Sequence, residues 1–333
     1  MKAIGYQRSL PVTEAESLLD IELSKPKATG KDLLVKVEAI SVNPVDTKVR
    51  MGVEPEQGQY KVLGWDAVGV VEQVGDECIE FSVGDRVWYA GDLNRSGSNA
   101  EFQLVDERIV SKAPVTLSNA EAAALPLTTL TAWEMLFDRI DVDTTEDKTI
   151  LIIGAAGGVG SIMVQLVKQL TNLRVIATAS RLETTAWLEE LGADQVINHR
   201  NPLSEEIGKE NCVDYVVSLN CTEQHITEAV KILKPQGKFG LIDDPQDLSV
   251  LPFKQKSISL HWEFMYTRSM FETEDMLEQQ KILGAVAGMI DEGRLKTTVS
   301  DQFGLINAAN LKRAHALIES QKSKGKIVLE GFY

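Results

Sequence analysis

A glycine-rich stretch at residues 154–160 has the composition of a loop that binds a phosphate group. It reads Gly-Ala-Ala-Gly-Gly-Val-Gly and follows the apolar run 150–153, which is typical of a buried parallel strand. Apolar residues then recur with helical spacing as far as Leu170. At a strand-to-helix turn, glycines let backbone N–H groups approach a pyrophosphate, and the helix N-terminus attracts the anion. The stretch predicts a dinucleotide site, the alternative being a tight turn without a ligand. Its contacts would come from Gly154, Ala155, Ala156, Gly157, Gly158 and Val159.

The residues after the following strands indicate which dinucleotide is bound. Sites that prefer NAD carry a carboxylate about 20 residues beyond the glycines, where it binds the ribose 2′-hydroxyl. The strand-like run 174–179 is instead followed by Ser180 and Arg181, whose hydroxyl and guanidinium groups suit a 2′-phosphate. We therefore predict NADPH, the alternative being that Arg181 is a solvated loop residue. Asp243 follows another strand and is expected near the nicotinamide ribose, because ligands bind beyond the carboxyl ends of parallel strands.

The cysteines and histidines do not form a metal-binding pattern. A structural zinc ion needs four clustered ligands, and a catalytic zinc ion needs three. The three cysteines are far apart in the sequence, and the four histidines show no ligand spacing (Cys78, Cys212, Cys221; His199, His225, His261, His315). We therefore predict no metal site and no disulfide framework. Each histidine is expected at the surface or at a helix cap.

The elements that position these residues fall into two patterns. Residues 1–124 carry short strand-like runs that are typical of an antiparallel β domain (32–40, 68–74, 86–90, 100–105). From Ser118, which forms a capping box with Glu121, strands and helices alternate (strands 150–153, 174–179, 195–198, 214–219, 238–242; helices 130–140, 159–170, 222–233, 274–292). This α/β alternation predicts a doubly wound parallel sheet. We predict a cofactor domain at 125–271, inserted into a β domain made of 1–124 and 272–333.

The composition excludes several classes of partner. The 333 residues are 44% hydrophobic and 25% charged, as in soluble globular proteins, and carry a formal net charge of −15. A charge of this sign disfavours binding to nucleic acids and to anionic membrane surfaces. No apolar run approaches the ~20 residues of a membrane span, and the N-terminus lacks the apolar core of a signal peptide. We therefore predict a cytoplasmic protein.

Several motifs give the chain a resemblance to a known family. One segment resembles the signature of the quinone oxidoreductase/ζ-crystallin branch of the medium-chain dehydrogenases/reductases: Asp147-Lys148-x-x-Leu151-x-x-x-Ala155-Ala156-Gly157-Gly158-x-Gly160-x-x-x-x-Gln165-x-x-Lys168. Other segments also fit this zinc-type alcohol dehydrogenase-like superfamily: Asn43-Pro44-Val45-Asp46, Gly64-Trp65-Asp66, Gly84-Asp85 and the closing Gly-Lys-Ile-Val. The resemblance covers nearly the whole chain. It implies a Rossmann domain inserted in a GroES-like β-barrel domain, an active site in the cleft between them, and a homodimer formed through the Rossmann sheets.

The chain departs from the zinc-dependent members at the positions of the metal ligands. Asn43 and Trp65 stand where those enzymes have a cysteine and a histidine, and Leu125 stands near the second cysteine. Tryptophan and leucine cannot bind zinc, and an amide oxygen is a weak ligand for it. The resemblance therefore implies a zinc-free enzyme. Without a Lewis acid, alcohol oxidation is disfavoured, whereas hydride transfer to an electron-poor acceptor needs less help.

Four residues are candidates for the catalytic site. Asn43 matches a position near the nicotinamide in the resembled enzymes, and Asp46 belongs to the same motif. Their alternatives are a turn residue and the N-cap of a short helix. Trp65 is expected either to form a wall of the pocket or to lie in the core. Tyr60 is the nearest phenol to that segment and is a candidate proton donor, with a surface loop position as its alternative.

Five more residues are candidate contacts of the cofactor. Thr129 resembles a hydroxyl near the carboxamide and phosphate groups, with a helix start as its alternative. His199 and Arg200 follow the third parallel strand, where relatives place a tyrosine against the adenosine; a solvated strand end is their alternative. Phe264 and Tyr266 are expected in a loop that covers the nicotinamide, or in a core between domains.

These expectations combine into one predicted function with three alternatives. We predict an NADPH-dependent, zinc-independent reductase of quinones or α,β-unsaturated carbonyl compounds. The first alternative is an enoyl-thioester or azo-type reductase with the same fold. The second is an NADPH-binding protein without catalytic activity, and the third is a zinc alcohol dehydrogenase.

Overall fold

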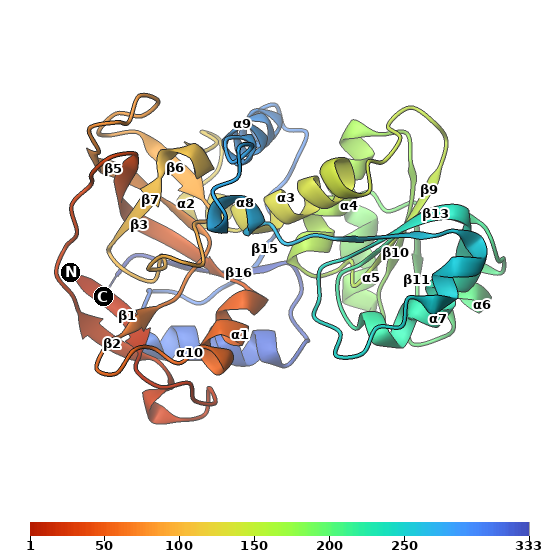
Figure 1. Ribbon diagram of the computed structural model, residues 1–333, viewed down its shortest axis with the longest axis horizontal. Helices are drawn as coiled ribbons and strands as arrows, with labels where there is room; N and C mark the ends of the chain where they lie inside the picture. Colours follow the sequence, from red (N-terminus) through yellow and green to blue (C-terminus); the bar gives the residue numbers. More distant parts are fainter. Residues whose placement is uncertain (333) are drawn as a thin grey trace. The chain divides into compact units, whose positions relative to one another are not determined.

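The computed structural model describes residues 1–332, which form two compact units (Figure 1). Unit 1 contains residues 1–130 and the chain from Tyr266 onward, and unit 2 contains Thr131–Met265. The segments 125–130 and 266–271, which the sequence places in the inserted domain, belong to unit 1. Among the described residues, no helix is both long and apolar enough to cross a membrane.

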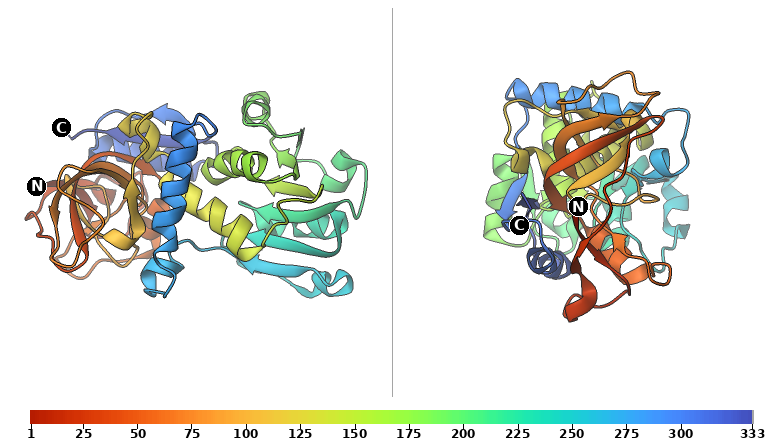
Figure 2. Two further views of the ribbon diagram at one scale, coloured as in Figure 1. Left: turned by 90° about the horizontal axis from the view of Figure 1, so that it is seen from above. Right: turned by 90° about the vertical axis from the view of Figure 1, so that its left-hand side faces the viewer.

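Six parallel strands form the sheet of unit 2. In sheet order they are β11 (Gln195–Ile197), β10 (Arg174–Thr178), β9 (Thr149–Ile153), β12 (Val213–Ser218), β13 (Leu233–Leu241) and β14 (Ser259–Trp262). Strands β10 and β11 lie on one side of β9, and the later strands β12, β13 and β14 lie on the other. The predicted doubly wound parallel sheet is therefore confirmed. Helices lie on both faces of the sheet (Figure 2): α4 (Gly158–Leu170), α5 (Leu182–Glu190), α6 (Leu203–Ile207) and α7 (Thr222–Ile232).

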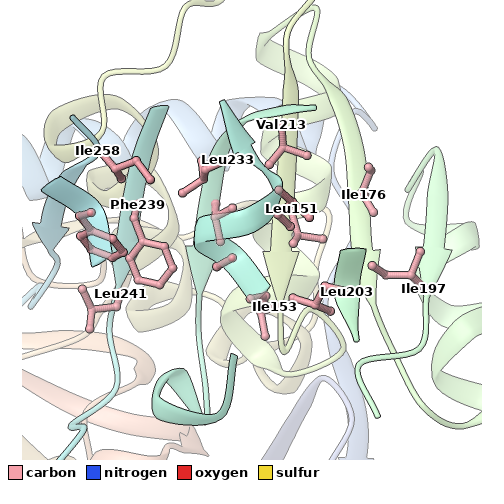
Figure 3. Packing of buried hydrophobic residues seen from close by; sticks show 14 residues of the cluster. Leu151, Ile153, Ile176, Ile197, Leu203, Val213, Leu233, Phe239, Leu241 and Ile258 are labelled. Atoms are coloured by element: carbon pink, nitrogen blue, oxygen red, sulfur yellow. The ribbon is translucent and has the colours of Figure 1, made fainter. Parts of the chain in front are cut away.

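The core of unit 2 explains why its central strands read as continuous apolar runs. Figure 3 shows side chains from neighbouring strands, among them Leu151 and Phe239, in one apolar layer. Helix α7 and the 3₁₀-helix η4 (Leu251–Lys256) cover this layer. Ile150 and Ile152, which alternate with these residues on β9, are buried as well. Because the sheet is covered on both faces, its central strands β9 and β12 bury all but one residue each and lose the alternating pattern.

Unit 1 is built from two sheets of short strands. The larger has the order β15 (Val299–Gln302), β16 (Lys326–Glu330), β3 (Asp32–Val42), β5 (Ala67–Val74), β6 (Arg86–Tyr89) and β8 (Val110–Lys112), with β7 (Phe102–Asp106) paired to β3. The smaller contains β2 (Leu19–Glu22), β1 (Lys2–Tyr6) and β4 (Lys61–Val62). Strand pairs are antiparallel except β15–β16. Because β16 pairs with β3, residues from both ends of the chain build the same sheet.

The helices of unit 1, and the helix that continues from it into unit 2, differ in part from the predicted ones. Helix α2 (Asn119–Ala123) begins with the predicted capping box, α8 (Thr267–Met270) is a single turn, and α9 (Glu278–Asp291) packs on β8. Helix α3 (Pro126–Trp133) starts before the predicted residue 130 and continues as a π-helix, η3 (Glu134–Arg139). A helical periodicity cannot reveal such a change of pitch. Helices α1 (Pro44–Gly52) and α10 (Ala308–Glu319) lie side by side (Figure 1).

His315 on α10 contradicts the expectation that each histidine lies at the surface or caps a helix. Its side chain is fully buried, and Nδ1 lies 3.2 Å from a guanidinium nitrogen of Arg50 on α1. Burial, together with the charge of Arg50, lowers the pKa of His315 to about 3. The neutral ring therefore accepts a hydrogen bond from Arg50, which also forms an ion pair with Glu319. These contacts hold α1 against α10.

Acidification is expected to destabilise the protein through His315. Its folded-state pKa lies below the ordinary value, so between the two values the unfolded chain binds a proton that the folded chain excludes. The free energy of unfolding should therefore fall by up to about 1.4 kcal/mol per pH unit as the pH drops below about 6. The variant His315→Gln keeps an acceptor for Arg50 and should show a smaller loss in thermal denaturation. An equal acid sensitivity of wild type and variant would contradict this assignment.

Candidate functional site

The glycine loop of unit 2 joins β9 to α4 at the carboxyl edge of the sheet. Gly154 has a φ of 76°, which permits the turn out of the strand, and its N–H donates to Thr178 Oγ1 at 3.1 Å. A Cβ atom at Gly160 would lie 2.3 Å from the carbonyl oxygen of Ala155. Glycine is therefore required at this position for α4 to pack against the end of the strand.

The N-terminus of α4 fits a phosphate group. The first N–H groups of a helix have no partner within it, and here Gly158 and Val159 open the helix without an acidic side chain in its first turn. A Cβ atom at Gly157 would meet only the carbonyl oxygen of Gly154, at 3.6 Å, so the space beside the N-cap is open. The hydroxyl of Ser161 accepts a hydrogen bond of 2.9 Å from the Trp187 indole of α5, which braces the loop.

Ser180 and Arg181 lie just beyond the carboxyl end of β10, the strand next to β9. Arg181 is the N-cap of α5, and Glu183 lies in the first turn of that helix. The Arg181 side chain is 37% exposed and forms an ion pair of 3.2 Å with Glu183. One carboxylate uses only part of the five N–H donors of an arginine. The guanidinium therefore keeps donors that a phosphate group can use.

His199, beyond β11, packs against a histidine of α7. The rings of His199 and His225 are 6.1 Å apart and nearly perpendicular. Burial lowers the pKa of both rings, so they are neutral at pH 7 and offer apolar faces to a base. Arg200 is exposed. Asp243 accepts the N–H of Thr222 at 2.9 Å and so caps α7, and its contact with a ribose stays a prediction.

In unit 1, Asn43 and Asp46 start helix α1. Asn43 is the N-cap, and Asp46 is the third helical residue, whose carboxylate accepts the N–H of Asn43 at 2.7 Å. The reading of Asp46 as an N-cap is therefore wrong. Both side chains are buried. Burial raises the pKa of Asp46 to about 7, although the N–H of Asn43 and the charge of Lys326 oppose this rise. Asp46 thus exchanges its proton near neutral pH.

Asp66 is the centre of a buried polar cluster. Its Oδ2 accepts hydrogen bonds from Ser41 Oγ at 2.7 Å, Asn43 Nδ2 at 2.8 Å and Lys326 Nζ at 2.9 Å. Its Oδ1 accepts the N–H of Leu127, in the first turn of α3, at 2.7 Å. Lys326 also donates to the amide oxygen of Asn43. These residues, called the Asp66 cluster below, join β3, α1, α3 and β16.

Trp65 and Tyr266 pack together in unit 1. Their rings meet edge to face, with centroids 6.4 Å apart, and the indole N–H of Trp65 donates to the carbonyl of Asp92 at 3.2 Å. Both side chains are buried. Burial, and then the carboxylates of Asp46 and Asp66, raise the pKa of Tyr266 well above its ordinary value. Its hydroxyl therefore stays protonated and can act only as a neutral donor or acceptor.

Three other predicted residues differ in their exposure. Tyr60 is 38% exposed, which agrees with its alternative as a surface loop residue. Phe264, at the end of unit 2, is half-exposed. Thr129 is fully buried within α3, and its hydroxyl has no hydrogen-bond partner among residues 1–332. An unpaired buried hydroxyl costs free energy, so a hydrogen-bond partner supplied by a ligand would stabilise Thr129.

Asp66, Lys326 and His225 are functional-site residues that the sequence does not predict. Asp66 and Lys326 stood in motifs that fit the resembled family, but neither motif indicates that the two side chains meet. His225 carried no local signal, because its contact with His199 depends on how α7 packs against the chain that follows β11.

Comparisons with known proteins agree with this architecture. Two family models match the chain, the alcohol dehydrogenase GroES-like domain at residues 29–115 and the zinc-binding dehydrogenase at residues 191–329. A zinc-type alcohol dehydrogenase-like protein of Staphylococcus aureus (strain COL) is 42% identical over 99% of both chains. A chloroplastic quinone-oxidoreductase homolog of Spinacia oleracea is 29% identical over 99% of this chain and 98% of its own.

Two solved structures extend the comparison. A putative zinc-dependent alcohol dehydrogenase from Rhizobium etli CFN 42 superposes with a TM-score of 0.96 and is 52% identical in sequence. The match covers 100% of this chain and 98% of that chain. A mycobacterial protein complexed with NADPH has a TM-score of 0.83 and 26% identity, with 99% of each chain covered.

Proposed function

The chain belongs to the zinc-type alcohol dehydrogenase-like family of the medium-chain dehydrogenases/reductases, and we propose that it is an NADPH-dependent, zinc-independent reductase. Its acceptor would be a quinone or an α,β-unsaturated carbonyl compound. Because it belongs to this family, the chain is an oxidoreductase with a GroES-like domain and a Rossmann domain. The cofactor and the type of acceptor are the parts that we propose.

The Asp66 cluster is the observation that supports a reaction without zinc. A zinc site needs three protein ligands with available lone pairs. The oxygens of Asn43 and Asp66 already accept hydrogen bonds from the ammonium of Lys326, and Trp65 presents an N–H group that cannot coordinate a metal. A dication would therefore have to displace a buried cation. The residues of this chain do not fit the zinc that the description of its family model implies.

The residues of the glycine loop and its neighbours fit NADPH. Gly157, Gly158 and Val159 would bind the pyrophosphate through the start of α4, and Ser180 with Arg181 would bind the 2′-phosphate. His199 would contact the adenosine. Bound NADPH would supply the hydride. The NADPH complex of the mycobacterial relative supports this assignment.

The buried groups of unit 1 suit an acceptor that gains negative charge on an oxygen atom. Tyr266 stays protonated and can donate a hydrogen bond, which would stabilise a developing enolate or hydroquinone oxygen. Asp46 exchanges its proton near neutral pH and can supply one after hydride transfer. We propose Asn43 and Trp65 as groups that position the acceptor, and Tyr60 as the alternative proton donor.

A panel of acceptors tests the proposal. We expect NADPH oxidation with a benzoquinone or a simple enone, and little or none with an enoyl thioester or an azo dye. Fast turnover of the enoyl thioester alone would favour the first alternative. Tight NADPH binding without turnover of any acceptor would favour a non-catalytic protein. Turnover of alcohols would contradict the proposal.

Arg181 offers a test of the cofactor that does not depend on the acceptor. The variant Arg181→Ala removes the guanidinium and should weaken NADPH binding by about 10-fold or more, while NADH binding changes little. Arg174→Ala is the control, because Arg174 is an exposed arginine at the start of β10, the strand that precedes Arg181. Nucleotide fluorescence titration measures both constants. Equal losses for NADPH and NADH would rule out a contact between Arg181 and the 2′-phosphate.

We also propose a homodimer formed through the Rossmann sheets. Among the described residues, β14 pairs only with β13, so it is an edge strand of its sheet, and Trp262 at its end is 49% exposed. An exposed strand edge with a large apolar side chain suits pairing with a second copy. Light scattering of the purified protein should give twice the mass of the chain. A monomer would contradict this part of the proposal.

A further inference from the structure

Two buried glutamates of unit 2 take no part in the function proposed above. Glu134 lies in the π-helix η3, and Glu263 follows directly after β14. Both carboxyl groups are fully buried. Arg139, from the end of η3, donates to Glu263 at 2.7 Å and lies 3.7 Å from Glu134. One guanidinium therefore faces two buried carboxyl groups.

In the sequence, each glutamate lies close to one of the two places where the chain passes between the units. The chain enters unit 2 after Leu130 and leaves it after Met265. Glu134 comes a few residues after the first passage, and Glu263 comes shortly before the second. The carboxyl pair thus joins, within unit 2, the two segments that connect it to the rest of the protein.

The carboxyl groups of Glu134 and Glu263 lie within hydrogen-bonding reach of each other, and a bond between them requires a proton. Ionised carboxylates only accept, so one member of the pair must carry a proton to donate to the other. Burial, and then the charge of Glu134, raise the pKa of Glu263 to about 8, against the opposing charge of Arg139. The pair therefore holds a proton at neutral pH and loses it in mildly alkaline solution.

The other charged or titratable groups of η3, β13 and β14 have partners elsewhere or are acidic, and Lys234 of β13, for example, bonds to Asp214. Lys238 of β13 donates to the carbonyls of Ile140 and Asp141. His261 of β14 bonds to Ser259. Asp138 of η3 would add only negative charge. When the proton leaves, two adjacent carboxylates share a single guanidinium, and their repulsion in a medium of low dielectric is strong.

We propose that Glu134 and Glu263 form a proton-operated latch between the two connecting segments. When protonated, one carboxyl group donates to the other and closes the latch. When ionised, the two groups repel each other, and η3 and the end of β14 loosen. The π-helix agrees with this role, because π-turns within helices are frequently found at functional sites.

Hydrogen exchange against pH tests the latch. In the wild-type protein, amide exchange in residues 131–139 and 259–266, corrected for its intrinsic pH dependence, should rise at least about threefold between about pH 7 and about pH 9. In Glu134→Gln and Glu263→Gln the amide group donates at every pH, so this rise should vanish. Glu189→Gln, an exposed residue of α5, is the control and should behave like the wild type.

Infrared spectra give a second measurement. Because Asp46 is also a buried carboxyl group that exchanges its proton near neutral pH, the spectra are compared with those of the glutamine variants. At pH 7 the wild-type protein should show a C=O band of a buried protonated carboxyl group that is missing from Glu134→Gln and Glu263→Gln, and this band should disappear as the exchange rises. Absence of the band at pH 7 would overturn the proposal. So would a flat exchange profile in the wild type, or a rise that persists in both glutamine variants. The latch does not depend on which acceptor the protein reduces.

Discussion

Replacing Lys326 with methionine is expected to lower the free energy of unfolding by about 3–5 kcal/mol, because it removes one partner of a buried ion pair. Lys326 is 3% exposed and is the only cation that bonds to Asp66 in the described part of the chain. Methionine has a similar length, so the loss should reflect the charge rather than a cavity. Asp66 would keep its carboxylate without a counter-charge, and β16 would lose its link to α1 and α3.

Two further variants identify the cause of this loss. Lys322→Met, at an exposed position of the same segment, should cost less than about 0.5 kcal/mol. The double variant Lys326→Met with Asp66→Asn removes both charges and should recover part of the stability lost in the single variant. Urea denaturation measures all three. If the Lys326→Met protein were as stable as the wild type, Lys326 would not stabilise the fold through its ion pair with Asp66.

Gly160→Ala is expected to cost about 3 kcal/mol or more and to abolish NADPH binding, because the added methyl group forces α4 away from the end of β9. The Cβ atom would lie 2.3 Å from the Ala155 oxygen and 2.4 Å from the Ala155 Cα. Neither backbone atom can move without shifting the whole loop. Thermal denaturation and fluorescence titration with NADPH measure the two effects.

Gly157→Ala is the matched control, because it separates folding from binding. Its Cβ atom would meet nothing closer than 3.6 Å, and its φ of −75° suits alanine. The variant should therefore remain nearly as stable as the wild type. Because the methyl group enters the open space beside the start of α4, NADPH binding should still weaken. Full binding by Gly157→Ala would show that this space is not where the pyrophosphate lies.

The features that the sequence predicted well are those with local causes. The glycine loop, the apolar run 150–153 and the capping box at Ser118 each depend on residues close together in the chain, and each is found in the structure. The doubly wound order of unit 2 followed from the alternation of strands and helices. Local sequence patterns did not predict the π-helix or the edge strand β14. Strand β14 is too short and too exposed to show a periodic signal.

The residues that the sequence did not predict are held by contacts between distant segments. Lys326 and Asp66 are 260 positions apart, and Arg50 meets His315 across 265 positions. Nothing in the sequence around His315 distinguishes it from an exposed histidine of an amphipathic helix. Only the packing of α10 against α1 decides that it is buried. The raised pKa of Asp46 has the same origin, because burial is its largest cause.

Turnover in the absence of a bound metal is the most direct test of the proposed zinc-independent reduction. The protein would be dialysed against EDTA, analysed for bound metals, and assayed with NADPH and a benzoquinone. We expect less than about 0.1 zinc ion per chain and an unchanged rate after dialysis, because Lys326 occupies the donors that zinc would need. One zinc ion per chain, with activity lost on chelation and restored by zinc, would contradict the account.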